Sequence, residues 1–245
     1  MNCDSEMTRD ILYGVHGTGF LKNRKMIFKS RREAGKRLLK ELRHLESRNP
    51  IVIGIARGGI PVAYEIAHGL GSELTVLVTE KLQSPDDPNK LLGCLCEGGA
   101  LCMDPFVRSR LSDDQIERIK EEKNQAIQEQ IEKFRKGREL PSLHNRQVIV
   151  VDDGIVTGST MIASWKMIQK QKPGKTIAAL PVASYWMSLK MEELFDEVVT
   201  LEISDQLTDL SDVYEKYKPV SQDTVKNLFD INSAILKMRH SPYYL

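Results

Sequence analysis

The sequence predicts an α/β protein with a doubly wound, mostly parallel sheet. Three observations support this fold class. Short apolar segments of strand length alternate with amphipathic segments of helical length along most of the chain. Two of the apolar segments end abruptly in polar, glycine-bearing loops, as the carboxyl ends of parallel strands often do. A hairpin-like stretch in the middle and an amphipathic stretch near the C-terminus indicate a flexible hairpin or loop and a C-terminal helical addition.

Length and composition limit the class of protein. The 245 residues suffice for one large α/β domain, which we expect over residues 26–245 after a flexible extension over residues 1–25. The 35 basic and 34 acidic residues leave a net charge of +1, so we expect no nucleic-acid or membrane partner. No apolar run approaches the roughly 20 residues that span a bilayer, and we expect a cytoplasmic protein.

The four cysteines do not form a disulfide framework in a chain of this size; they are Cys3, Cys94, Cys96 and Cys102. The Cys94-x-Cys96 spacing could suggest a metal, but no Cys-x-x-Cys motif or nearby His completes a set of four ligands. We therefore expect reduced cysteines within strands.

The first predicted helix spans residues 31–46. The capping box Ser30-x-x-Glu33 opens it and Asn49-Pro50 stops it. The next elements are a buried strand over 51–56, a crossover helix over 61–70, a second strand over 74–79 and a loop over 82–90.

The second half of the chain begins with a hairpin signal and ends with a helix. Apolar residues 91–96 and 100–103 flank Glu97-Gly98-Gly99. A long helix over 112–137, opened by a capping box at Ser112, has a narrow apolar stripe and lies on a surface or against a partner subunit. The remaining predicted elements are a strand over 148–151, a helix over 159–171, a strand over 176–183, a helix over 186–195, a strand over 197–203 and a helix over 221–238 that covers a sheet edge or the site.

Residues 146–160, RQVIVVDDGIVTGST, are the most informative stretch. The apolar run up to Val151 has the length and β-branched content of a strand buried on both faces, and it ends in Asp152 and Asp153, here called the acid pair. Two adjacent carboxylates at the end of a buried strand repel each other and need a cation or hydroxyl donors nearby. The acid pair is therefore a candidate site for sugar hydroxyls.

The loop after the acid pair predicts a phosphate site. Gly154 and Gly158 bracket it, and Thr157, Ser159 and Thr160 stand where an apolar helical pattern begins. A glycine-bearing loop that runs into a helix N-terminus directs backbone N–H groups and the positive end of the helix dipole at one point, which suits a phosphate. The alternative is an ordinary strand, turn and helix cap, which explains the cap but not the paired aspartates.

A second polar loop, Arg57-Gly58-Gly59, follows the first predicted strand. Its glycines allow close backbone approach to a ligand, and Arg57 supplies a cation with several donors. Because the ends of neighbouring parallel strands line one crevice, this loop can lie beside the acid pair, where pyrophosphate would fit. Lys81, after the second strand, is a further candidate. The alternatives are a helix-entry turn with a solvated Arg57 and a surface Lys81.

The stretch VIVVDDGIVTGST resembles the signature of the type I phosphoribosyltransferases, which is a hydrophobic run, two acidic residues and a loop ending in Thr-Gly-x-Thr. Arg57-Gly58-Gly59 matches the Arg-Gly-Gly form of that family's pyrophosphate loop. Across residues 26–230, including IFKSRREAG and IARGGIPVA, the chain is similar to a subgroup of predicted phosphoribosyltransferases. The resemblance implies a Rossmann-like type I fold, a hairpin or loop that closes over the ligands, and a role in nucleotide metabolism.

The resemblance also implies roles for the site residues. The acid pair would bind the ribose hydroxyls of phosphoribosyl pyrophosphate (PRPP), and the following loop would bind its 5′-phosphate; the loop residues are Gly154, Ile155, Val156, Thr157, Gly158, Ser159 and Thr160. Arg57, Gly58, Gly59 and Lys81 would contact pyrophosphate, and the residues expected to act in catalysis are Arg57, Lys81, Asp152 and Asp153. The family uses Mg²⁺, held largely by ligand oxygens and water, so no protein ligand is assigned.

The implied reaction transfers a phosphoribosyl group to a nucleobase-like small molecule and releases pyrophosphate. We also expect the protein to form a homodimer. The family's 6-oxopurine members have an Asp immediately before the Thr-Gly, where this chain has Val156. This departure disfavours hypoxanthine, guanine and xanthine, and it leaves adenine, a pyrimidine or another nucleophile open. The main alternative is a non-catalytic PRPP or nucleotide sensor on the same fold. An RNA-binding regulator would need a basic face, but its only hints, Lys22 to Lys25 and Arg31-Arg32, are explained as solvated charges.

Overall fold

The structure is a computed structural model that describes residues 27–83 and 91–239. The expected extension over residues 1–25 and the basic stretch Lys22 to Lys25 lie outside the described residues, as do Cys3 and residues 84–90 of the expected loop. Within the described ranges, no helix is long and apolar enough to cross a bilayer.

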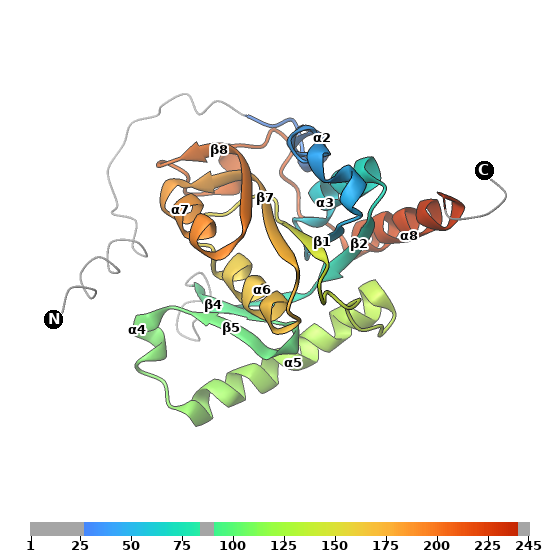
Figure 1. The fold of residues 1–245 in the computed structure, drawn as a ribbon. Helices are drawn as coiled ribbons and strands as arrows, with labels where there is room; N and C mark the ends of the chain where they lie inside the picture. The colour runs from blue at the N-terminus through green and yellow to red at the C-terminus, as the bar shows by residue number, and fades with distance from the viewer. Residues whose placement is uncertain (1–26, 84–90, 240–245) are drawn as a thin grey trace.

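A five-stranded parallel sheet forms the centre of the molecule (Figure 1). Its strands, in spatial order, are β2 (Glu73–Leu77), β1 (Ile51–Ile55), β6 (Gln147–Val151), β7 (Lys175–Ser184) and β8 (Glu197–Ser204). Every neighbouring pair is parallel, and Ile53 of β1 lies opposite Thr75 of β2 and Val150 of β6. The strands predicted over residues 51–56, 148–151, 176–183 and 197–203 are confirmed as β1, β6, β7 and β8. Counting the strands of this sheet alone gives the doubly wound order 2-1-3-4-5.

Helices cover both faces of this sheet, as predicted (Figure 1). One face packs against α2 (Arg31–Glu41) and α3 (Ile60–Leu70), and the other packs against α6 (Ser159–Lys170) and α7 (Tyr185–Leu194). Successive strand residues point to opposite faces, so Val52 packs with α2 and α3 while Ile51 and Ile53 pack with α6. The final helix, α8 (Gln222–Arg239), contacts α3 and the edge strand β2, so it covers an edge of the sheet.

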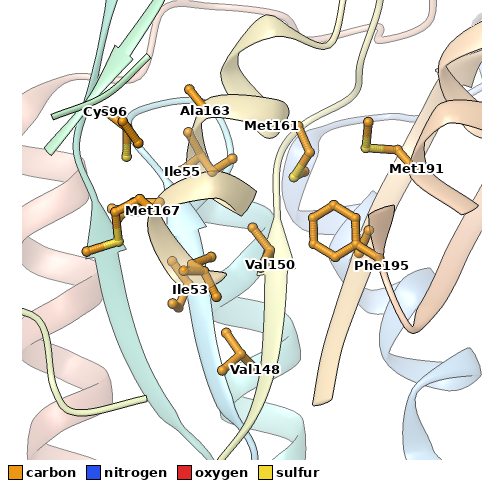
Figure 2. Close-up of a cluster of buried hydrophobic side chains, with 14 of the residues drawn as sticks. Ile53, Ile55, Cys96, Val148, Val150, Met161, Ala163, Met167, Met191 and Phe195 are labelled. Atoms are coloured by element: carbon orange, nitrogen blue, oxygen red, sulfur yellow. The ribbon is translucent and has the colours of Figure 1, made fainter. Parts of the chain in front are cut away.

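The larger of the cores lies between the sheet, α6 and α7 (Figure 2). Isoleucine and valine side chains of β1 and β6 meet Met161, Ala163 and Met167 of α6, and Met191 of α7 and Phe195 close one end of the cluster. This core fixes the start of α6 against the carboxyl ends of the strands. The loop between β6 and α6 is thereby held between two rigid elements.

A second sheet has three antiparallel strands, β3 (Thr79–Gln83), β4 (Leu91–Cys96) and β5 (Ala100–Met103). The hairpin predicted here is confirmed, with a short 3₁₀ turn, η2 (Glu97–Gly99), between β4 and β5. The single strand predicted over residues 74–79 is wrong, because β2 ends at Leu77 and β3 begins at Thr79 in the other sheet. Lys81 therefore lies inside β3, and not in a segment after the central strand.

Helix α6 lies between the two sheets (Figure 1). Lys166 donates to the carbonyl oxygen of Leu101 at 3.0 Å, and Lys170 donates to the carbonyl oxygen of Gly98 at 3.1 Å. Cys94 and Cys96 are buried in β4 against this helix, and Cys102 is half-buried in β5. All three are free thiols, and the described residues contain no cluster of three or more His, Cys, Asp or Glu able to hold a metal.

The long helix α5 (Asp113–Arg135) has the predicted capping box between Ser112 and Gln115. Its apolar stripe packs on the second sheet, with Ile127 and Ile131 against Leu95 of β4. A short helix, α4 (Pro105–Arg108), precedes it and was not predicted, although Asp104 caps its N-terminus.

The predicted helix over residues 31–46 is shorter than expected. Regular α-helix ends at Glu41, and the chain continues as the 3₁₀ helix η1 (Arg43–Arg48). Leu42 and Leu45 are still buried there. The apolar spacing therefore fits a 3₁₀ helix as well as an α-helix, and the sequence pattern alone does not distinguish the two. A last short 3₁₀ turn, η3 (Leu210–Asp212), lies between β8 and α8.

Candidate functional site

A cavity of about 720 Å³ opens at the carboxyl ends of β1 and β6. From β1 the chain first adds β2 on one side, and it later adds β6, β7 and β8 on the other, so the cavity lies at the point where the strand order reverses. Ligands of open α/β sheets bind at this switch point. The walls come from the loops after both strands, from β3 and from residues 208–220.

The loop after β1 supplies Arg57 and Gly58 to the cavity. Arg57 is exposed, and the Ala56–Arg57 peptide bond is cis. A Cβ atom added at Gly58 would lie 2.5 Å from a carboxylate oxygen of Asp153, and one at Gly59 would lie 2.5 Å from the carbonyl oxygen of Val151. The two loops predicted to meet are thus in direct contact, and the glycines permit that contact. Gly59 is buried beneath the loop and does not line the cavity.

The loop after β6 is held in place by the end of β7. The N–H of Ile155 donates to the carbonyl oxygen of Val182 at 2.9 Å, and the N–H of Ser184 donates back to the carbonyl oxygen of Ile155 at 3.0 Å. The Ser184 hydroxyl also donates to the carbonyl oxygen of Val156 at 3.0 Å. Gly154, with φ of 145°, occupies a conformation that side chains rarely adopt, so a glycine is needed there.

The end of this loop forms the start of α6. Gly158, with φ of 73°, precedes the first helical residue, and a Cβ atom there would lie 2.5 Å from the sulfur of Met187. Thr157, Gly158 and Thr160 line the cavity, whereas the Ser159 hydroxyl is buried without a hydrogen-bond partner and Ser159 does not line it. The N-terminus of α6 is nevertheless directed at the cavity wall, and it is a suitable place for a phosphate.

The two carboxylates of the acid pair have different surroundings. Asp153 is buried, and its Oδ2 pairs with Nε of Arg31 at 2.7 Å. Asp152 is half-buried, and its Oδ1 accepts the N–H of Asp153 at 2.9 Å. Burial and, next, the Asp153 carboxylate raise the pKa of Asp152 well above its usual value, while Lys81 opposes this shift. Asp152 is therefore poised to accept a proton or a hydrogen-bond donor.

Lys81 lines the cavity from β3, together with Thr79 and Glu80. Its side chain is exposed, so the position agrees with a contact to a bound anion and also with a surface lysine. The cavity also contains carboxylates able to contribute oxygen ligands to Mg²⁺, which prefers such donors. Asp152 is one of these, and unlike Asp153 it does not pair with Arg31.

Several lining residues were not identified from the sequence. Arg31 was interpreted as a solvated charge, and this is wrong, because it is only 8% exposed and pairs with Asp153. Its position in IFKSRREAG, just after a helix cap, was the available signal. The others come mainly from the segment before α8, which has no clear periodicity; they are Thr208, Asp209, Leu210, Tyr217, Pro219 and Val220.

The fold and the cavity agree with the phosphoribosyltransferase class. A family model for the phosphoribosyl transferase domain matches residues 101–218, which include the acid pair and the loop after it. The resemblance to this family is thus confirmed for residues 101–218.

The relatives agree with this assignment. Two predicted phosphoribosyl transferases of Mycobacterium tuberculosis, MT0597 and Rv0571c, are 31% identical to the chain over 206 residues, which are 83% of this chain and 46% of each relative. The chain thus spans about half the length of these curated relatives. The crystal structure of TT1426 from Thermus thermophilus is 30% identical, with a TM-score of 0.71, over 83% of this chain and 98% of that one.

Proposed function

We propose that the protein is a PRPP-dependent phosphoribosyltransferase that uses Mg²⁺, transfers the phosphoribosyl group to a nucleobase-like acceptor and releases pyrophosphate. One observation supports this most directly. The acid pair, the glycine loop leading into α6 and the Arg57 loop all border one cavity of about 720 Å³ at the switch point of the sheet. Each matches one part of PRPP, namely its ribose, its 5′-phosphate and its pyrophosphate.

In this proposal the protein acts by position and charge. Asp152 and Asp153 accept hydrogen bonds from the ribose hydroxyls, and the loop from Gly154 to Thr160 holds the 5′-phosphate at the helix N-terminus. Arg57 and Lys81 stabilise the negative charge that builds on the departing pyrophosphate, and donors of this kind each contribute roughly a hundred- to a thousandfold in rate. Arg57 and Lys81 are exposed at the cavity, so their side chains can adjust to a ligand.

Mg²⁺, when bound, would neutralise pyrophosphate charge and so make it a better leaving group. The cavity fits an ion held mainly by substrate oxygens. Within the described residues no cluster of three or more metal-binding side chains exists, yet the half-buried Asp152 carboxylate lines the cavity. Asp152 is the residue that we assign to such an ion, directly or through water.

Val156, Leu210 and Tyr217 are apolar or aromatic residues of the cavity lining. The Val156 side chain packs against the buried cluster that contains Phe28 and Tyr214, and Leu210 and Tyr217 pack against the same cluster. Val156 stands at the position where 6-oxopurine enzymes have an Asp, so the residue that handles a purine ring proton in those enzymes is missing from this loop. We propose that the acceptor is a flat, largely apolar ring other than a 6-oxopurine.

Calorimetric titration with PRPP and Mg²⁺ tests the proposal, followed by a panel of bases while pyrophosphate release is measured. We expect binding, release with at least one base, and loss of both in the double variant Asp152→Asn/Asp153→Asn. The control Asp223→Asn/Asp230→Asn makes the same charge change on exposed residues of α8 and should bind as wild type does. Binding without release for any base would favour a PRPP sensor, and undiminished binding by the acid-pair variant would refute the site.

A further inference from the structure

Arg31, the first residue of α2, joins three parts of the site that are far apart in the sequence. Its Nε donates to Oδ2 of Asp153 at 2.7 Å, and its Nη1 donates to the carbonyl oxygen of Lys218 at 2.8 Å. The guanidinium also lies 4.1 Å from the ring centre of Tyr217. One side chain thus connects α2 with the acid pair and with the segment before α8.

The Asp153 carboxylate is confined from the other side as well. The Gly58 backbone packs directly against it, since a Cβ atom at that position would come within 2.8 Å of both carboxylate oxygens. The Tyr214 hydroxyl donates to the carbonyl oxygen of Asp153 at 2.7 Å and so fixes the backbone. The Asp153 side chain is 8% exposed and that of Arg31 is 10% exposed. Burial of a carboxylate is costly without a cation and hydrogen-bond donors beside it, and Arg31 supplies both.

The neighbouring arginine provides a natural comparison. The Arg32 side chain is 58% exposed, pairs with Glu65 and does not line the cavity. Arg31 lines the cavity and is 8% exposed as a whole residue. Two adjacent arginines therefore have different environments, one directed into the site and the other to the surface of α2.

We propose that Arg31 is a positioning residue for the ribose half of the substrate. It holds the Asp153 carboxylate in one orientation, and it ties that carboxylate to the segment containing Tyr217, which forms part of the cavity wall. This inference rests on the proposed function, because it assumes that Asp153 receives a ribose hydroxyl. The planar guanidinium meets two acceptors and an aromatic face at once, which a lysine ammonium does not reproduce.

The test compares the affinities of PRPP and of pyrophosphate, both with Mg²⁺, measured by calorimetry on the whole chain. Pyrophosphate lacks the ribose, so its binding depends on the Arg57 loop and not on Asp153. For Arg31→Gln we expect PRPP affinity to fall by about tenfold or more, since a charged hydrogen bond is lost, while pyrophosphate affinity stays within about twofold of wild type. Arg31→Lys should fall between Arg31→Gln and wild type.

The matched control is Arg32→Gln, which removes the same charge one residue away. It leaves the buried Glu65 without its partner, but neither residue lines the cavity, so both ligands should bind as they do to wild type. Unchanged PRPP affinity in Arg31→Gln, or an equal loss for both ligands, would overturn the inference. If Arg31→Gln does not fold, Arg31→Lys decides, because it keeps a cation beside Asp153; a PRPP affinity equal to wild type would overturn the inference. A wild-type protein that binds pyrophosphate but not PRPP would instead overturn the proposed function, and the Arg31 inference with it.

Discussion

At the scale of the residue, two adjacent aspartates have opposite electrostatic surroundings. Asp153 faces Arg31 and the tyrosines before α8, whereas Asp152 has no ion pair among the described contacts and a raised pKa. Adjacent residues at the end of a strand point in opposite directions, so one carboxylate turns towards α2 and the other towards the side of Lys81. We conclude that an acid pair of identical residues contains two non-equivalent groups.

This difference predicts the stability of Asp152→Asn without ligand. The raised pKa means that folded Asp152 keeps its proton to a higher pH than the unfolded chain does, so its ionisation lowers the free energy of unfolding as pH rises. The amide removes this cost. We expect the Tm of the variant to exceed that of wild type by about 2 °C or more near pH 8, and the difference to shrink towards about pH 4. Thermal unfolding across this range is the measurement.

Asp153→Asn is the control for this prediction, because it leaves Arg31 buried without its counter-ion. We expect it to lower the Tm, so that the two aspartate variants change stability in opposite directions. A lower Tm for both variants at every pH would contradict the assigned environment of Asp152.

At the scale of the element, a buried ion pair joins the hairpin to the long helix. Glu97 in the turn η2 pairs with Arg135 at the end of α5, and the two side chains are 7% and 3% exposed. The other carboxylate oxygen of Glu97 accepts the N–H of Val78 at 2.8 Å, next to the start of β3. Burial raises the pKa of Glu97 and Arg135 opposes that shift. One side chain thereby fixes the hairpin, β3 and α5 together.

Glu97→Gln should therefore be strongly destabilising. The amide can still accept the Val78 N–H, but it leaves Arg135 as a buried cation without a counter-charge, a situation that costs about 3–5 kcal/mol in free energy of unfolding. Denaturant unfolding measures this loss. The matched control is Glu117→Gln on the same helix, whose partner Lys120 is on the surface, and it should cost about 1 kcal/mol or less. Equal losses in the two variants would disprove a special role for the Glu97 pair.

At the scale of the whole molecule, the cavity lies where separate parts meet. The loops after β1 and β6 belong to the central sheet, Thr79 and Lys81 belong to the second sheet, and residues 208–220 close another side. A ligand that contacts all of these would connect the second sheet to the central one. We therefore expect β3, the strand of the second sheet that lines the cavity, to become more rigid when ligand binds.

Amide hydrogen exchange tests this expectation. With PRPP and Mg²⁺ we expect slower amide exchange in β3 (Thr79–Gln83) and in the loop from Gly154 to Thr160. Exchange of the solvent-exposed residues of α5 (Asp113–Arg135) should stay unchanged. The Asp152→Asn/Asp153→Asn variant should show none of these changes. Protection of the 154–160 loop alone would mean that β3 and Lys81 do not contact the ligand.

Local signals were sufficient for most elements and for the two loops that border the cavity. The helix caps at Ser30 and Ser112 were predicted correctly, since they depend on residues three positions apart. The full capping box forms at Ser112, whereas at Ser30 the structure shows only the bond from the Glu33 N–H to the Ser30 hydroxyl. The acid pair, the glycine loop and Arg57 were identified because their chemistry is unusual within a few residues. The break between β2 and β3 was missed, because an apolar run does not show that its two ends belong to different sheets.

The sequence by itself determined the fold class, the order of the elements and the two loops that border the cavity, because strand length, helical periodicity, caps and glycines act over short distances. Only the tertiary structure decided how those loops are completed. Arg31 meets Asp153 across 122 positions and the carbonyl oxygen of Lys218 across 187, and no local pattern encodes such contacts. These contacts form only when α2 and the segment before α8 pack over the strand ends. The same packing buries Asp153, and a buried carboxylate is costly without a cation such as Arg31 beside it.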